Sequence, residues 1–207
     1  MKIRLTNVGK RFNREWIFRH LNIEFSSAKS YAIIGPNGSG KSTLLQIIAG
    51  AVLFNEGEIE YYLSEQKIES EKIYAHISIA APYLELVEEM TLIEFLHFHS
   101  ALKPLLPNIT SQQIISILHL NDAAQKQIRY FSSGMKQRVK LAQAIFSNTQ
   151  VVLLDEPCTN LDDEGIALYK NLVNTYCKNR LLIISSNDKQ EYNFCEKMID
   201  MKTYKFS

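Results

Sequence analysis

The sequence predicts an α/β fold with a mostly parallel β-sheet that carries helices on both faces. Three observations support this prediction: short continuous apolar runs alternate with helix-like segments, a glycine-rich loop joins one such run to a helix, and the opening residues alternate like an antiparallel hairpin. The 207 residues are 46% hydrophobic and 22% charged, which excludes a disordered or low-complexity chain. We expect one domain over residues 1–207, because this length can bury a single core.

The first quarter of the chain shows strand patterns followed by one helix pattern. Residues 3–8 and 16–25 alternate polar and apolar side chains, and residues 26–30 then break the pattern like a turn. We expect the two strands to pair as an antiparallel hairpin. Residues 31–34 form a short apolar run that ends at a glycine-rich loop, and residues 41–49 after the loop have helical spacing.

The middle of the chain changes from strand signals to helix signals. Residues 58–63 and 73–80 have the composition of two further strands. Two capping boxes then mark helix starts: Thr91 with Glu94, and Thr110 with Gln113. We therefore expect residues 83–128 to form a helical subdomain, inserted into a core made of residues 1–82 and 129–207.

The last third of the chain alternates helix patterns with apolar strands. Helix patterns cover residues 134–146 and 163–177, and continuous apolar runs cover residues 151–154 and 181–184. Strands that are apolar at every position are buried on both faces, as in parallel sheets covered by helices. These elements complete the predicted core.

Charge and cysteine content narrow the expected partners and compartment. Lysine and arginine total 23 against 22 aspartate and glutamate, so the net charge of +1 gives no reason to expect nucleic acid as a partner. The start has no signal-peptide pattern and no apolar run approaches the length of about 18 residues that spans a membrane, so we expect a soluble, cytoplasmic chain. Cys158, Cys177 and Cys195 form no CxxC pair, and we expect three free thiols.

The glycine-rich loop matches a phosphate-binding motif, because residues 35–43 satisfy G-x-x-x-x-G-K-[ST] between a predicted strand and a predicted helix. Its glycines let backbone N–H groups turn toward a phosphate, and the helix N-terminus adds a positive dipole end. Lys41 would reach the β- and γ-phosphates, and Ser42 would be a ligand of Mg²⁺. The predicted nucleotide-binding residues are Gly35, Pro36, Asn37, Gly38, Ser39, Gly40, Lys41, Ser42 and Thr43. The alternative, a glycine-rich turn with an incidental lysine, is disfavoured because the motif and its flanking elements agree.

Two acids follow the apolar strand at residues 151–154, at the edge where open α/β sheets bind their ligands. Asp155 is placed to hold Mg²⁺, and Glu156 to polarise the water that attacks the γ-phosphate. Acids often end strands, so the pair gains its meaning from the phosphate loop. Together the two motifs predict a site for the phosphates of a nucleotide and for Mg²⁺. A GTPase would be expected to carry an Asn-Lys-x-Asp segment, which the sequence lacks.

The segment FSSGMKQR, residues 131–138, precedes the strand that ends in Asp155. With this segment and the two motifs above, the chain resembles an ABC-type ATPase subunit over essentially its whole length. The resemblance implies a P-loop NTPase core, an N-terminal antiparallel β-subdomain and a helical insertion. It also implies that Ser132 and Gly134, in the signature loop, contact the γ-phosphate held by the other subunit of a head-to-tail dimer. Alone, the segment would be read as a serine-rich helix cap.

Other residues take their roles only through the resemblance. Phe12 matches the aromatic residue that stacks on adenine in this family, with Trp16 as the runner-up. Residues 159–162 match the loop that runs across the dimer seam. Residues 82–90 lie where the family receives a short helix from its membrane subunit, although their apolar side chains could equally close the core of the helical subdomain.

Two departures from the family pattern affect chemistry. Pro82 stands where relatives usually have a glutamine that touches Mg²⁺ and the attacking water, and proline offers neither a side-chain amide nor a backbone donor. Asn187 stands where the family has its switch histidine. Its amide can hydrogen-bond a γ-phosphate oxygen, but it carries no charge and accepts no proton at neutral pH. We therefore expect catalysis by Glu156, Lys41 and Asn187 to be slow.

The resemblance implies a nucleotide-binding subunit of an ABC transporter that acts with a separate transmembrane permease. We expect ATP and Mg²⁺ to be held between two ATPase subunits, as a homodimer or a heterodimer, on the cytoplasmic face of the membrane. The ending Gly134-Met135 resembles a version frequent in ABC-2-type exporters. The alternative is an ATP-gated clamp or regulatory binding module with little or no turnover.

Overall fold

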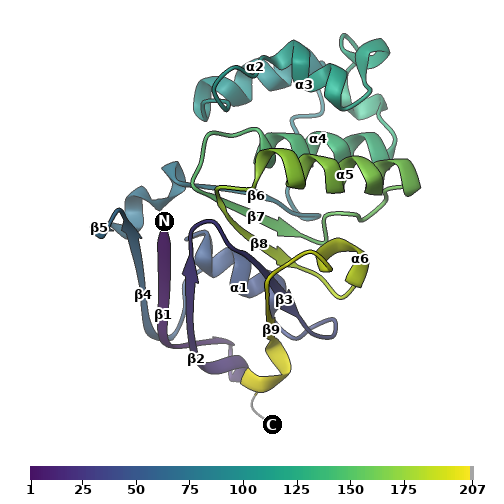
Figure 1. The fold of residues 1–207 in the computed structure, drawn as a ribbon. Helices are drawn as coiled ribbons and strands as arrows, with labels where there is room; N and C mark the ends of the chain where they lie inside the picture. The colour runs from purple at the N-terminus through teal and green to yellow at the C-terminus, as the bar shows by residue number, and fades with distance from the viewer. Residues whose placement is uncertain (206–207) are drawn as a thin grey trace.

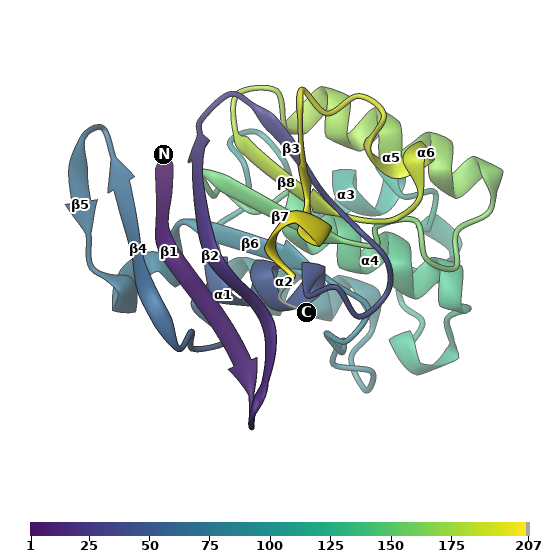
Figure 2. The same cartoon turned by 90° about the horizontal axis from the view of Figure 1, so that it is seen from below.

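Two β-sheets, one antiparallel and one parallel, organise the chain in the computed structural model, which describes residues 1–205 (Figure 1). The antiparallel sheet has the order β2-β1-β4-β5. Its strands are β1 Lys2–Phe12, β2 Glu15–Ser26, β4 Glu56–Leu63 and β5 Gln66–Ile68. The predicted hairpin is confirmed, because Ile3 pairs with Phe25 and Leu5 with Ile23 across β1 and β2. Figure 2 shows these long strands curving along one side of the molecule.

The parallel sheet has the order β6-β7-β8-β3-β9, and every neighbouring pair in it is parallel. Its strands are β3 Ser30–Ile34, β6 Ile77–Ala80, β7 Val151–Asp155, β8 Leu181–Ser185 and β9 Lys197–Asp200. Every residue of β7 and β8 is buried, which explains why both strands are apolar along their length. Because all five strands run in one direction, their carboxyl ends meet at the same edge.

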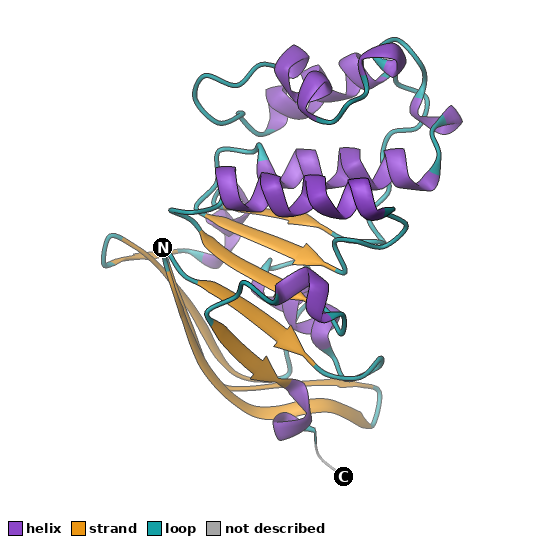
Figure 3. Ribbon diagram, turned by 45° about the vertical axis from the view of Figure 1, so that its right-hand side comes forward, coloured by secondary structure: helices purple, strands orange, loops and turns teal. Residues whose placement is uncertain are grey.

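Helices cover both faces of the parallel sheet, as predicted. The helices α4 Ser133–Ile145 and α5 Asp163–Tyr176 lie side by side on one face (Figure 3), and α1 Lys41–Ile48 packs between the parallel and the antiparallel sheet. Successive side chains of a strand point to opposite faces. Accordingly, Val152 and Leu154 of β7 pack in a core with α4 and α5, whereas Val151 and Leu153 pack in a second core with α1.

The stretch that the sequence marks as helical lies beyond α4 and α5 (Figure 1). It contains α2 Leu92–Leu102, α3 Ser111–Ile117 and the short 3-10 helices η2 Asn121–Ala123 and η3 Ile128–Tyr130. Both predicted capping boxes are confirmed. The hydroxyls of Thr91 and Thr110 accept hydrogen bonds from the N–H groups of Glu94 and Gln113, whose side chains accept in return from the threonine N–H groups.

Some elements differ from the prediction for physical reasons. The expected strand 73–80 is wrong in its first half, because Ser70–Ala75 forms a 3-10 helix, η1, that buries Ile73 beside Gly50 and exposes Tyr74. The sequence also gave no signal for β5, β9, α6 Lys189–Tyr192 or η4 Met201–Tyr204. β9 is an edge strand with exposed side chains, and α6 is too short for a periodic pattern. Within residues 1–205, no helix has the length and apolar character needed to cross a bilayer.

Candidate functional site

The predicted phosphate loop connects β3 to α1 at the carboxyl edge of the parallel sheet. Gly40 caps α1 with φ 92°, in the left-handed region. A Cβ atom at Gly40 would lie 2.6 Å from Cγ2 of Ile17, so both conformation and packing require glycine there. Gly38 also has a positive φ, and a Cβ atom added to it would meet no atom within 4 Å. The loop therefore presents open space above the start of α1.

Lys41 is held inside this loop and is only 5% exposed. Its Nζ donates hydrogen bonds to the carbonyl oxygens of Gly35, at 2.9 Å, and Pro36, at 3.3 Å. The side chain thus folds back across the loop, which places its charge at a cavity of about 200 Å³. This cavity is lined by Asn37, Gly38, Gly40, Lys41, Ser42, Thr43 and Glu156. The structure therefore brings the loop and Glu156 to one cavity.

Asp155 and Glu156 occupy the carboxyl end of β7. Asp155 is 1% exposed, and its Oδ1 has no hydrogen-bond partner among the described residues. Glu156 has φ 43°, and its N–H donates to the Ser185 carbonyl at 2.8 Å, so the chain turns sharply just after the strand. A buried carboxylate oxygen without a donor suits a cation better than a structural role.

The oxygen atoms of Ser42 and Asp155 fit Mg²⁺, which prefers oxygen ligands and usually completes its shell with water and substrate phosphates. Residues 1–205 contain no cluster of three or more His, Cys, Asp or Glu that could hold a metal by themselves. A metal here would therefore need oxygens from a bound nucleotide. Asp155 supplies the buried, unpartnered oxygen toward which such an ion would be drawn.

Asn187 follows β8 and lies against the phosphate loop. Its Nδ2 donates to Oδ1 of Asn37 at 3.0 Å. Asn187 also lines another cavity, of about 290 Å³, together with Gly35 and Pro36. Asn187 thus lies next to the phosphate loop, and its role in hydrolysis stays a prediction. Its amide is oriented by a neighbouring amide, and no charged group takes part in this contact.

Pro82 lies beyond the end of β6 and is exposed, and its carbonyl oxygen accepts a hydrogen bond from Lys140 Nζ at 2.9 Å. The next residue, Tyr83, was missed by the sequence reasoning. Burial raises the pKa of Tyr83, a hydrogen bond with Gln46 lowers it, and the nearby negative charge of Asp155 raises it further. A polar hydroxyl thus lies within electrostatic reach of Asp155, directly after the residue that replaces the glutamine.

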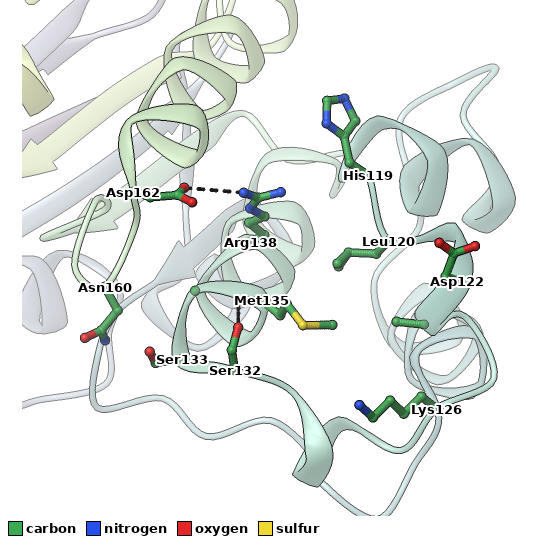
Figure 4. Close-up of a pocket in the computed structure, with 12 residues that line it drawn as sticks. His119, Leu120, Asp122, Lys126, Ser132, Ser133, Met135, Arg138, Asn160 and Asp162 are labelled. Carbon is green, nitrogen blue, oxygen red and sulfur yellow. Dashed lines mark hydrogen bonds and ion pairs between the residues drawn. The ribbon is translucent and has the colours of Figure 1, made fainter.

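A separate cavity of about 600 Å³, called the second cavity below, lies at the N-terminus of α4 (Figure 4). Ser132 is the N-cap of α4, and its Oγ accepts a hydrogen bond from Met135 N at 3.2 Å. A Cβ atom on Gly134 would lie 3.1 Å from the Asn160 carbonyl oxygen, so glycine allows these two loops to approach closely. The residues lining this cavity include Ser132, Gly134 and Asn160 but none from the phosphate loop. Within one chain, the structure does not bring the two sets together.

An ion-pair network supports this second cavity. Arg138 contacts Asp162 at 3.4 Å and Glu164 at 3.8 Å, joining α4 to the start of α5 (Figure 4). The hydrogen bond from Gly165 N, together with the charge of Arg138, lowers the pKa of Asp162. The loop of residues 159–162 is therefore fixed against the N-terminal half of α4.

Phe12 and Trp16 lie near the turn between β1 and β2. Phe12 is 50% exposed, whereas the Trp16 ring is partly buried with the Arg19 guanidinium 4.2 Å from its centroid. The phosphate-loop cavity is not lined by either ring. Phe12 is the more exposed residue of the two, and its stacking on adenine stays a prediction.

The three cysteines are free and buried, as expected. Burial raises the pKa of Cys158 to about 12, so this thiol stays protonated and unreactive although it lies close to Glu156 in sequence. Its N–H donates to Oε1 of Glu191 at 2.7 Å, and burial raises the pKa of Glu191. Glu191 was missed because its role depends on contact between distant segments.

Comparisons with known proteins agree with this geometry. Residues 18–159 match the family described as ABC transporter. The chain is 34% identical over 156 residues to the cytochrome c biogenesis ATP-binding export protein CcmA of Xylella fastidiosa, covering 75% of this chain and 72% of that one. It is 28% identical over 207 residues to the ABC transporter ATP-binding protein YybJ of Bacillus subtilis, covering 96% and 92%.

Solved structures share the fold. The dimeric structure of MJ0796, a bacterial ABC transporter cassette, superposes with a TM-score of 0.80 at 22% identity, covering 96% of this chain and 93% of that one. A bacterial Atm1-family ABC exporter with ATP bound gives 0.79 at 19% identity, covering 96% of this chain and 37% of that one. The matched family model covers more than half of the residues. The chain therefore belongs to the ABC transporter family, as an ABC-type ATPase nucleotide-binding subunit.

Proposed function

We propose that this subunit binds ATP and Mg²⁺ between two ATPase subunits and hydrolyses ATP slowly to drive a separate transmembrane permease. The observation that carries the proposal is that the phosphate-loop cavity and the second cavity are separate within one chain. Lys41 and Glu156 line one cavity, while Ser132 and Gly134 line another that shares no residue with it. A second subunit is needed to bring a signature loop to a bound nucleotide.

In this proposal the phosphate-loop cavity supplies the chemistry. The loop N–H groups and Lys41 bind the phosphates, and Ser42 and Asp155 hold Mg²⁺, which when bound would neutralise charge on the phosphate oxygens. Glu156 lines the same cavity as Lys41 and is placed to accept a proton from the attacking water.

The second cavity supplies binding without catalytic groups. The α4 N-terminus, the Ser132 hydroxyl and the glycine at position 134 suit an anion such as a γ-phosphate. If each subunit presents this face to the phosphate loop of the other, the interface is two-fold and self-complementary. ATP then favours the closed dimer because it contacts both subunits only there, and hydrolysis removes that difference in affinity.

Slow turnover is proposed because two groups of the family pattern are replaced. Asn187 is a neutral amide bound to Asn37, and Pro82 has no side-chain donor. The loss of one oriented donor in a polar transition state typically costs about a hundred- to a thousandfold in rate. Tyr83 and Asn187 are the polar groups that remain near the replaced positions. The same replacements favour the second candidate, an ATP-gated clamp with little or no turnover.

A membrane partner is proposed from the exposed stretch of residues 82–90. Tyr83 and Val87 expose apolar surface in this stretch, and Phe98 and Leu102 expose more on α2. Glu85 and Glu89 are exposed within the same stretch, so the surface suits a short amphipathic helix with basic flanks. Such a partner would place the subunit at the cytoplasmic face of the membrane. The Gly134-Met135 ending supports an exporter.

The test combines sedimentation with phosphate release by the purified subunit. We expect Glu156→Gln to form a dimer with ATP and Mg²⁺ but not with ADP, and to release no phosphate. Glu71→Gln, an exposed acid in η1, serves as the matched control and should behave like the wild type. Phosphate release by Glu156→Gln at the wild-type rate contradicts the catalytic role. A dimer without any wild-type phosphate release identifies the clamp, and a monomer at saturating ATP rejects the dimer.

A further inference from the structure

Lys10, near the end of β1, is a buried ammonium group that the family motifs leave without a role. It is 9% exposed, and its Nζ donates to the Leu53 carbonyl at 2.8 Å. The same Nζ lies 4.5 Å from the centroid of the Phe12 ring. Among residues 1–205, no carboxylate lies within ion-pair distance of Lys10.

The backbone around Phe12 is also fixed by the loop that follows α1. Asn55 N–H donates to the Gly9 carbonyl at 2.8 Å, and the Asn55 side-chain oxygen accepts from Arg11 N–H at 2.9 Å. These bonds hold the residues on both sides of Lys10. The Lys10 ammonium group and the backbone on both sides of Lys10 are therefore held by one short loop, residues 53–55.

A buried ammonium costs free energy, and here one carbonyl oxygen and the face of one aromatic ring offset that cost. Because the ammonium covers one face of the Phe12 ring while the side chain is half exposed, the other face is left for a ligand. A cation on one face draws electron density from the ring. An electron-rich purine stacked on the opposite face is then attracted more strongly.

We propose that Lys10 is a positioning residue for Phe12, and that the pair forms a platform for the adenine base of the nucleotide. This inference rests on the proposed binding of ATP and on the stacking of adenine on Phe12 that the family resemblance implies. It adds that base affinity depends on a buried charge which itself never touches the nucleotide. The phosphates are held separately, by the loop around Lys41.

The experiment compares a ligand that has the base with one that lacks it. ADP and inorganic pyrophosphate are titrated calorimetrically into the wild type, Lys10→Met, Lys10→Arg, Phe12→Leu and the double variant Lys10→Met with Phe12→Leu. Neither ligand requires hydrolysis. We expect Lys10→Met to weaken ADP binding about two- to fivefold and to leave pyrophosphate binding unchanged. Lys10→Arg keeps the cation and should restore ADP affinity, and Lys10→Met should add nothing in the Phe12→Leu background.

The outcomes distinguish a failure of the role of Lys10 from a failure of adenine stacking on Phe12. Equal weakening of both ligands by Lys10→Met would show a general effect on the site and overturns the inference. Unchanged ADP affinity in Lys10→Met, with weakening in Phe12→Leu, also overturns it but leaves adenine stacking intact. Unchanged ADP affinity in Phe12→Leu rejects the stacking itself. Thermal unfolding of each variant confirms that the compared proteins are folded.

Discussion

The phosphate-loop cavity and the cavity at the start of α4 use the same device in different ways. Both lie at the N-terminus of a helix, next to a glycine that permits close approach. The first is small and is lined by the buried Lys41 and by Glu156, and the residue before Glu156, Asp155, has a buried oxygen without a hydrogen-bond partner. The second is about three times larger, and two of its charged groups, Arg138 and Asp162, are paired with each other. The phosphate-loop cavity thus combines a buried cation with an acidic side chain for chemistry, whereas the second cavity offers more open space for binding.

The first prediction concerns the phosphate-loop cavity. It tests whether the neutral Asn187 at the switch position slows hydrolysis. Asn187→His should raise the rate of Mg²⁺-dependent phosphate release by about a hundredfold, because imidazole can carry charge and exchange a proton. Single-turnover phosphate release measures this effect apart from product release. The control is Asn187→Ala, which should be no faster than the wild type. An unchanged rate in Asn187→His would contradict the proposal that the replaced switch residue slows hydrolysis.

The second prediction compares ADP binding after removal of one lysine from each of the two cavities. Lys41→Met should weaken ADP binding roughly ten- to a hundredfold, because the charged hydrogen bonds to phosphate are lost. Lys126→Met, which removes a lysine from the second cavity, should leave ADP binding to the single subunit unchanged. Calorimetry measures both. Weakened ADP binding in Lys126→Met would show that the second cavity contributes to binding within one chain.

The third prediction concerns the second cavity alone. Ser132→Ala should weaken ATP-dependent dimerisation about tenfold, because one hydroxyl bond to a charged oxygen is lost. Ser133→Ala is the matched control, since Ser133 lines the same cavity but does not cap α4. Sedimentation in the Glu156→Gln background measures dimerisation. Equal effects of the two variants would contradict the assigned role of Ser132.

The smallest expected effect concerns Glu191, a buried acid that accepts a hydrogen bond from Cys158 N–H, two residues after Glu156. Burial raises the pKa of Glu191, so the folded state binds this proton more tightly than the unfolded state does. Its contribution to stability is full at acid pH and is lost as pH rises from the unfolded pKa through the folded pKa. Glu191→Gln should therefore raise the unfolding temperature at about pH 7 by roughly a few degrees, and leave it unchanged near pH 4. Equal gains at both pH values would show that charge is not involved.

Local motifs account for most of what the sequence could predict. The phosphate loop, the acids after β7 and both capping boxes depend on residues within a few positions of one another, and all occur at the predicted places. β9 carried no such signal, because an edge strand with exposed Lys197 and Met198 has no continuous apolar run.

Contacts between distant segments account for the rest. Tyr83 comes near Asp155 only because β6 and β7 are neighbours in the sheet, although residues 81–150 lie between the two strands in sequence. The second cavity requires the turn after α3, with His119, to fold over α4. The link from Lys10 to Leu53 joins β1 to a loop beyond α1. Short-range patterns contain no information about these approaches.

The burial of β7 in two cores links catalysis to global cooperativity. Alternate residues of this strand form a wall of each core, and the strand ends in the two acids. Melting of either core would withdraw support from Asp155 and Glu156 at once. Heating should therefore abolish nucleotide turnover and tertiary structure in one coincident transition, without an inactive intermediate that keeps either sheet intact.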